Sequence, residues 1–426
     1  MTIAETLFAA PARVETARPG RWGGVALGAA AVAVGTAVGL LRQPGVGALD
    51  TVWAEDGGVF LIEAVRQGPL DALVTSYAGY FHAVPRLMAA VATLFPAGAA
   101  AAVLALEAAV VVSLLALLVY VASGCHLTST FSRVLVSAPL VVVPLGQGDV
   151  LNSIANFHWY GLYALFWTLV WTPRRPAGRA VAVTVTFLVV ASDIVTVVFV
   201  PLALWRALRR PDGAARDRHG IMLAGALGAG LLIQFAGLLS GSSERELSPN
   251  PVLAVSGFLL RAVPAPLVGE RWLGESVDAR WIALAAIAWL VVGAATLVAY
   301  TRRTRPARTL AVVAGLHAAA LYMVPVLLSG VATPRYAVAP AMLVITTLVA
   351  LLQPADSRVP LYSLAALLAL VAAVNLRVDN ARANGPAWRA EIEVAREECA
   401  LRPARTVDVA IPPDWSVPLP CSYLSR

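Results

Sequence analysis

The sequence predicts an all-α polytopic membrane protein with about eleven transmembrane helices. Of its 426 residues, 59% are hydrophobic and only 13% are charged, whereas soluble domains are roughly half apolar and a quarter charged. Long apolar runs recur along the whole chain, and three cysteines are too few for a disulfide-rich scaffold. These observations exclude a soluble, disordered or collagen-like chain.

Eleven apolar segments approach the roughly 17 to 25 residues that a transmembrane helix needs. They cover residues 23–41, 97–121, 134–147, 158–172, 179–191, 194–206, 220–239, 281–300, 309–329, 337–353 and 360–375. Ser192 and Asp193 interrupt one long run at its middle. We interpret that run as two short helices that meet near a membrane surface.

The distribution of arginine predicts the orientation. Arginines precede the first segment and fill alternate connections, whereas the complementary short connections, 146–158, 192–193 and 330–336, contain only Arg335. Because basic residues collect in cytoplasmic loops, we expect a cytoplasmic N-terminus and an extracytoplasmic C-terminus. The first segment is long for a signal peptide and no small-residue cleavage site follows it, so we expect it to be an uncleaved anchor. The net charge of +7 is thereby explained without nucleic acid. All 32 basic residues are arginine, which excludes lysine chemistry.

The chain divides into a transmembrane domain, residues 1–375, and a short extracytoplasmic tail, residues 376–426. Within the domain, residues 41–96 are too long for a simple connector. Their apolar pattern predicts two amphipathic helices lying on the outer leaflet, separated by Gly68-Pro69 and by an aromatic turn at residues 77–82.

The tail has helical periodicity over residues 387–399 and a proline-bounded extended piece over residues 407–419. Outside the cell, Cys399 and Cys421 are expected to form a disulfide that ties the end of the tail to its helix. Two unrelated reduced thiols remain the alternative. Cys125 falls near a cytoplasmic loop and is expected to be a free thiol.

Two adjacent carboxylates, Glu55 and Asp56, follow the first segment in the motif Trp53–Gly58. A carboxylate at a membrane surface can act as the general base for a sugar hydroxyl, and the Gly57-Gly58 pair permits close approach of a ligand. The alternative is that the acids cap the first turn of a helix. Both interpretations stay open.

Arg335 stands alone at the outer mouth of the tenth segment, where the orientation rule does not require an arginine. Its planar guanidinium matches the oxygens of a phosphate. Snorkelling toward lipid headgroups or pairing with a structural acid is the alternative. Arg86 is a weaker second candidate for a phosphate-binding cation.

Other polar residues also fall on the outer side. Asn156, His158 and Trp159 form a mixture suited to the hydroxyls and ring faces of a carbohydrate, or to a helix cap with an aromatic belt. Asp193 is either a functional intramembrane acid or a cap at a turn. The five histidines have no paired i, i+4 spacing and no phosphate loop is visible, so we expect no metal and no cofactor.

Together these features resemble the GT-C class of integral-membrane glycosyltransferases. Those enzymes have many spans, an acidic motif in a long first extracytoplasmic loop with surface-lying helices, and a sugar donor carried on polyprenyl phosphate. The acidic motif of the class would fall on Glu55 and Asp56, and its donor-phosphate arginine, in an Arg-Tyr context, on Arg335 and Tyr336. Many members carry a larger soluble C-terminal domain, so the acceptor-binding surface stays open.

The resemblance implies an inverting hexosyl or pentosyl transfer at the outer face of the plasma membrane, to a cell-envelope glycan, lipid or protein acceptor. Arg335, helped by Arg86, would neutralise the departing lipid phosphate, and Asp56 or Glu55 would deprotonate the acceptor. Secondary contacts to sugar or acceptor would come from Tyr80, His82, Asn156, His158, Trp159 and Asp193. A transporter or lipid-linked-sugar flippase is the main alternative, and a non-catalytic assembly subunit is the third.

Overall fold

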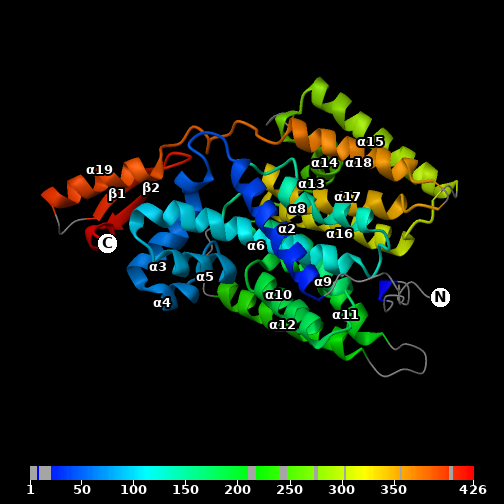
Figure 1. The fold of residues 1–426 in the computed structure, drawn as a ribbon, viewed down its shortest axis with the longest axis horizontal. Coiled ribbons are helices and arrows are strands. Elements are labelled where there is room, and N and C mark those ends of the chain that lie inside the picture. The colour runs from blue at the N-terminus through cyan, green and yellow to red at the C-terminus, as the bar shows by residue number, and fades with distance from the viewer. Residues whose placement is uncertain are drawn as a thin grey trace.

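The computed structural model describes residues 7–8, 21–209, 217–239, 247–272, 277–301, 304–355, 357–402 and 406–426. Within these ranges the chain is mostly helical, and its two strands form one small hairpin in the tail. The helices form an elongated bundle, with the tail at one extreme of its longest axis (Figure 1). The protein is therefore a helical, multi-pass membrane protein, as the composition predicts.

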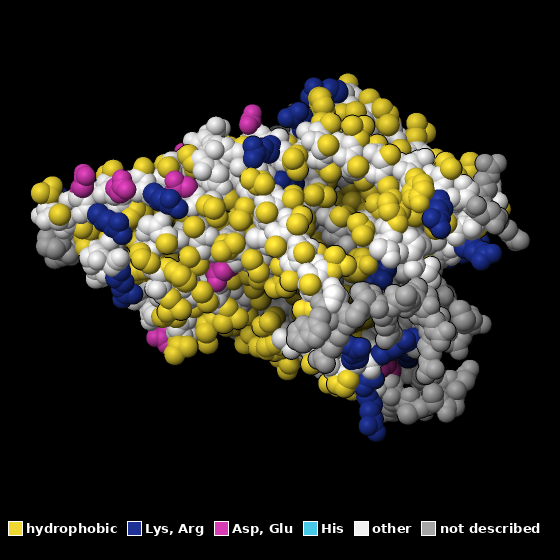
Figure 2. Space-filling model, in the orientation of Figure 1, with side chains coloured by type: hydrophobic (Ala, Val, Ile, Leu, Met, Phe, Trp, Pro, Cys, Tyr) yellow, Lys and Arg dark blue, Asp and Glu magenta, His cyan; other side chains and the backbone are white. Residues whose placement is uncertain are grey.

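Seven helical segments in the described ranges are long and apolar enough to cross a membrane. They are α2 (Arg21–Leu41), Ala97–Ser123 with α6 (Ala100–Ser123), α12 (Arg218–Leu239), Pro251–Val268, α15 (Ala279–Tyr300), α16 (Arg308–Ser329) and Pro334–Leu351 with η7 (Pro334–Ala337) and α17 (Val338–Leu351). Apolar side chains cover the middle of the visible face, and charged ones gather toward its ends (Figure 2).

Shorter apolar helices complete the bundle. They are α7 (Thr130–Ser137), α8 (Pro139–Val142), α9 (Phe157–Val170), α10 (Pro176–Val190), η4 (Ile194–Phe199), α11 (Val200–Leu208) and α18 (Val359–Val374). Each of the eleven predicted segments thus contains helix. The break at Ser192 and Asp193 separates α10 from η4, as expected, and every residue of α9 is buried. The count of eleven crossings stays a prediction.

Several helices end at the same end of the bundle, which we call the tail end. Arg42, just after α2, donates to the carbonyl oxygens of Val141 and Val143 at the end of α8, both at 2.6 Å, and to that of Leu376 after α18. The last turn of α16 lies at this end too, because Arg335, a few residues beyond it, contacts the connection that follows α2.

The segment Pro251–Val268 was not predicted from the sequence. It consists of α13 (Pro251–Gly257), a π-helical turn η5 (Phe258–Ala262) and α14 (Ala265–Val268). The amide before it, at Asn250, donates to Leu327 in the last turn of α16, and the amide after it, at Glu270, donates to Pro144 beyond α8. Both of its ends therefore lie at the tail end, and the backbone stays right-handed helical where α13, η5 and α14 join.

The connection between α2 and α6 contains η1 (Ala48–Asp50), the π-helix η2 (Asp56–Leu61) running into α3 (Ile62–Gln67), α4 (Pro69–Leu73) and α5 (Ala83–Ala92). Helices thus form where the sequence predicts them. The first does not lie on the surface as expected, because Phe60 and Leu61 are buried and the tail covers it. Exposed apolar side chains occur instead on α4 and beside α5, with Leu70 and Leu94 the most exposed.

The tail folds into α19 (Trp388–Leu401), an antiparallel hairpin of β1 (Thr406–Ile411) and β2 (Trp415–Pro420), and α20 (Cys421–Leu424). Alternate residues of β1 are buried, as expected for a strand with one face against a core. Cys399 in α19 and Cys421 in α20 form the expected disulfide, and Cys125 is a free thiol. Strand β2 contacts η2 and α3, so the hairpin lies directly on the acidic motif.

Loss of the disulfide is expected to loosen the tail selectively. Replacing Cys399 and Cys421 together by serine opens a loop of 22 residues, which corresponds to about 3 kcal/mol of lost stabilisation of the tail. Limited proteolysis of the purified protein should then cut residues 376–426 faster, with the bundle unaffected and Cys125→Ser behaving as the wild type. Equal cleavage rates in the wild type and the double variant would show that the bridge does not hold the tail.

Candidate functional site

Glu55 and Arg335, far apart in the sequence, form an ion pair at the tail end. Oε1 of Glu55 lies 3.9 Å from Nη1 of Arg335, and their side chains are 19% and 28% exposed. Glu55 directly precedes η2, and Arg335 lies in η7. The two groups on which the sequence analysis depends are therefore brought together, with part of each side chain accessible.

Arg335 is held in the first turn of a continuous helical run. Pro334 occupies the first helical position of η7, where proline is favoured, and η7 leads directly into α17. The free amides and the dipole at the start of such a run add positive potential around the guanidinium. The local field therefore favours an anion at Arg335, which at present is the carboxylate of Glu55.

Asp56 has a different environment from Glu55. Its side chain is buried, and its Oδ1 accepts hydrogen bonds from the hydroxyl of Ser153 at 2.9 Å and the amide of Ala155 at 2.8 Å. Burial raises the pKa of Asp56 to about 6, against the opposing effects of Arg382 and of these two hydrogen bonds. Asp56 thus anchors another segment of the chain. Neither acid caps η2, since the side chain of Glu55 makes no capping hydrogen bond either.

Four further predicted residues form a continuous chain of contacts beside Arg335. The ring of Tyr336 lies 5.3 Å from that of Trp159, which lies 4.6 Å from that of His158. The indole N–H of Trp159 donates to Oδ1 of Asn156 at 3.3 Å, and the side-chain amide of Asn156 donates to the carbonyl of Asp149. Asn156, His158 and Trp159 are buried in protein, so they shape the wall behind Arg335 and do not form an aromatic belt facing lipid.

The remaining predicted cation belongs to a second cluster around Phe60. The ring of Phe60 lies 5.3 Å from that of His82. The guanidinium of Arg86 lies 5.3 Å from the centre of the Phe60 ring. Tyr80 stacks on His82 at 4.2 Å. Arg86 is fully buried, and its Nη1 lies 2.6 Å from Oε2 of Glu63. The partner of Arg86 is therefore Glu63, a residue that the sequence analysis did not single out.

Asp193 is a helix cap. Its Oδ1 accepts the amide of Val195 at 2.8 Å at the start of η4, and its side chain is buried. The preceding residues bind the start of α5, because the carbonyl of Ala191 accepts the amide of Ala83 and the hydroxyl of Ser192 accepts that of Val84. Asp193 thus lies in the turn that supports the helix of Arg86, in agreement with the capping alternative.

The glycine pair does not leave room for a ligand, so that prediction is wrong. A Cβ atom added at Gly57 would lie 2.7 Å from Cγ1 of Val52 and 2.8 Å from Cγ2 of Val417, and one at Gly58 would lie 2.8 Å from the ring of Trp415. Val417 and Trp415 belong to β2. The glycines permit close approach of the tail hairpin, a partner within the same chain.

Substitution of these glycines is therefore expected to weaken the tail–motif contact. Gly57→Ala should cost about 1–3 kcal/mol, since its neighbours Val52 and Val417 are buried. Gly58→Ala should cost less, because Trp415 is 40% exposed and its ring can turn away. Thermal unfolding of the purified protein measures both, with Gly225→Ala, which meets nothing within 4 Å, as the control. A Gly57→Ala variant as stable as that control would contradict the assignment.

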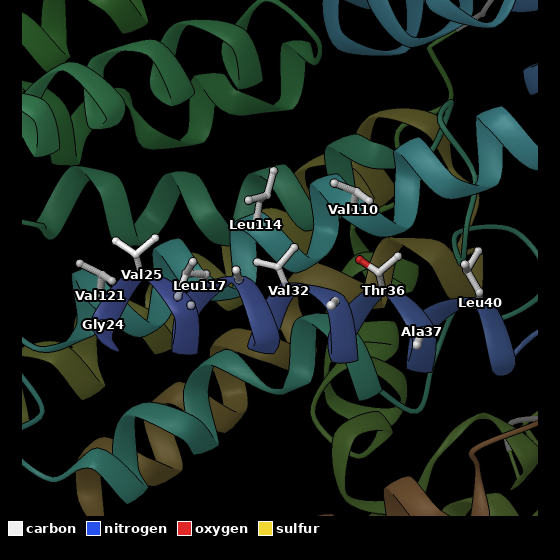
Figure 3. Close-up of a pocket in the computed structure, with 13 residues that line it drawn as sticks. Gly24, Val25, Val32, Thr36, Ala37, Leu40, Val110, Leu114, Leu117 and Val121 are labelled. Atoms are coloured by element: carbon white, nitrogen blue, oxygen red, sulfur yellow. The ribbon is translucent and has the colours of Figure 1, made fainter. Parts of the chain in front are cut away.

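An open groove of about 920 Å³ lies elsewhere, between α2 and α6 (Figure 3). Its lining is apolar apart from Thr36 and includes neither Glu55 nor Arg335. Among the described residues, no group of three or more His, Cys, Asp or Glu side chains is arranged to hold a metal ion.

Comparisons with protein families, curated proteins and solved structures find no match to this chain. Any assignment of function therefore depends on the side chains themselves. Sequence reasoning missed Ser153, Glu63 and Arg382. Ser153 lies beside the polar stretch that was singled out, but Arg382 is one of several tail arginines, and nothing in its local sequence distinguishes it.

Proposed function

We propose that the protein is a glycosyltransferase of GT-C type that moves a sugar from a polyprenyl-phosphate donor to a cell-envelope acceptor. The reaction would take place at the tail end of the bundle, on the outer face of the plasma membrane, with eleven crossings and a cytoplasmic N-terminus. The observation that carries the proposal is the accessible Glu55–Arg335 pair. A base and a phosphate-binding cation within 4 Å are the two groups that this transfer needs.

The donor phosphate would bind Arg335 in place of Glu55. A phosphate monoester or diester offers the guanidinium more acceptor oxygens than the present contact at 3.9 Å, and it would benefit from the same helix start. Arg86 is buried against Glu63, so it would have to break that ion pair before binding phosphate. We therefore assign phosphate binding to Arg335, with Tyr336 and the wall of Trp159 and His158 beside it.

Displacement from Arg335 would free Glu55 to act as the base. Its carboxylate takes the proton of the acceptor hydroxyl, the acceptor oxygen attacks the anomeric carbon, and the bond from that carbon to the phosphate oxygen breaks. The electron pair of the broken bond leaves with the polyprenyl phosphate, whose charge Arg335 balances. Glu55 is assigned this role over Asp56 because Asp56 is buried and already accepts two hydrogen bonds.

A lipid-linked-sugar flippase is the second candidate, and one observation favours it. The segment Pro251–Val268 is irregular, with a π-helical turn, and both of its ends lie at the tail end. Interrupted helices of this kind line the substrate sites of many transporters.

Reconstitution separates the two candidates. Purified protein in lipid vesicles, given radiolabelled polyprenyl-phosphate sugars and acceptor glycans, is expected to form a labelled glycosidic bond. Glu55→Gln should abolish bond formation while the protein stays folded. Label that crosses the bilayer without any new glycosidic bond would support the flippase and overturn the proposal.

A further inference from the structure

Arg382 lies in the tail, beyond the last predicted span, yet its side chain is completely buried. Its Nη1 donates to the carbonyl of Leu151, and its Nη2 donates to that of Asn152 at 3.3 Å. Burying a guanidinium is costly unless its donors are satisfied, and here Nη1 and Nη2 are bonded while Nε is buried without a hydrogen bond. The tail therefore inserts a charged group into the bundle to bind one short stretch of backbone.

Asp56 binds the same stretch through other atoms. It accepts the hydroxyl of Ser153 and the amide of Ala155, while Arg382 takes the carbonyls of the two preceding residues. Arg382 and Asp56 also attract each other electrostatically. Residues 151–155 are thus bound both by a cation from the tail and by an anion from the acidic motif.

This stretch has little regular structure of its own to hold its shape. Asn152 has a φ of 54°, in the left-handed region, and its side-chain amide donates to the carbonyl of Gly39 in α2. Directly after the stretch come Asn156 and the start of α9, which carries Trp159 against Tyr336. The position of residues 151–155 therefore sets the wall beside Arg335.

We propose that Arg382 is a positioning residue of the site, which acts from the C-terminal tail by holding residues 151–155 together with Asp56. The effect of Arg382 on sugar transfer rests on the proposed function, but its effect on the position of residues 151–155 does not. The short tail thereby helps to position the residues that form the site.

The interaction of Arg382 with Asp56 also makes the stability of residues 151–155 depend on pH. The groups that act electrostatically on Asp56 are Arg382, which lowers its pKa, and Glu55, which raises it, while Asp149 acts on Arg382. Loss of the cation at position 382 should raise the pKa of Asp56 further above about 6. The carboxylate that accepts the two hydrogen bonds would then be protonated over more of the neutral range.

Hydrogen–deuterium exchange of residues 148–158 in the full-length protein in lipid nanodiscs tests this. Arg382→Gln is expected to speed exchange of these residues by about tenfold or more. The pH at which their protection changes by half is expected to move upward. Arg382→Lys keeps the charge without the planar fork, so it should keep the midpoint while exchange increases partly. Arg389→Gln, an exposed tail arginine, should behave as the wild type.

Unchanged exchange in Arg382→Gln, or an equal increase in Arg389→Gln, would overturn the proposal, and so would a midpoint that shifts equally in the lysine and glutamine variants. In the transfer assay, Arg382→Gln should lower turnover with an upward shift of the pH profile. Absence of transfer in the wild type would count against the proposed function alone, because the exchange measurement needs no substrate.

Discussion

Replacement of Arg335 by glutamine is expected to weaken the binding of polyprenyl monophosphate by about 100-fold or more. Truncation of one partner in a charge-paired, partly buried contact costs about 2–5 kcal/mol, and Arg335 is the arginine that faces the accessible acid. Glutamine keeps much of the side-chain length and a hydrogen-bond donor but removes the charge. The affinity of the purified protein in nanodiscs for the labelled lipid measures the effect.

Arg377→Gln is the matched control. Arg377 is exposed at the same end of the bundle, where its Nε donates to the carbonyl of Leu41. It therefore loses the same charge near the same membrane surface, and we expect its affinity to stay within about threefold of the wild type. Equally weakened affinity in both variants would mean that binding of the lipid phosphate depends on general surface charge. The assignment of phosphate binding to Arg335 would then be wrong.

Glu55→Gln is expected to lower the turnover of sugar transfer by about 10²–10⁴-fold without unfolding the protein. General bases contribute rate factors of this size, and Glu55 is partly exposed, so an uncharged isostere fits its site. Turnover at saturating donor, measured by the formation of labelled product, reports the loss. Asp71→Asn, at an exposed acid of α4, serves as a control for the loss of one carboxylate in this connection.

Asp56→Asn distinguishes the two adjacent acids. An amide oxygen can still accept from Ser153 and Ala155, but the buried Arg382 loses its counter-charge, so we expect turnover to fall, though by less than in Glu55→Gln. Removal of the carboxylate also removes a titration near pH 6. Because burial raises that pKa, ionisation of Asp56 reduces stability as pH rises from about 4 to about 6 in the wild type. Loss of turnover in Asp56→Asn, with Glu55→Gln active, would assign the base to Asp56.

The apolar helices and the disulfide of the tail could be predicted from the sequence, because each depends on local signals. Hydropathy locates helices that must satisfy their backbone hydrogen bonds within lipid, and two cysteines in a short tail have few possible partners. Arg335 could also be singled out from the sequence, because it is the only arginine in the short connections that the orientation rule predicts to be free of arginine. Its meeting with Glu55 follows from both lying at the same end of the bundle.

The rest depends on contacts between distant segments. Gly57 and Gly58 look the same in sequence whether a ligand or β2 fills the space above them, and only the tail hairpin decides between these cases. The segment Pro251–Val268 has the hydropathy of a span, but hydrogen bonds at Asn250 and Glu270 bring both of its ends to one side. Arg382 has no local signal at all, because its partners lie more than two hundred positions away.

A double-mutant cycle on the affinity for polyprenyl monophosphate tests most directly whether Glu55 and the lipid phosphate compete for Arg335. In the wild-type background, Glu55→Gln should tighten binding, because it removes the carboxylate that occupies the guanidinium. In the Arg335→Gln background the same change should have no effect, which gives a coupling energy of about 1 kcal/mol or more. Strictly additive effects, or weaker binding on Glu55→Gln, would contradict the shared site.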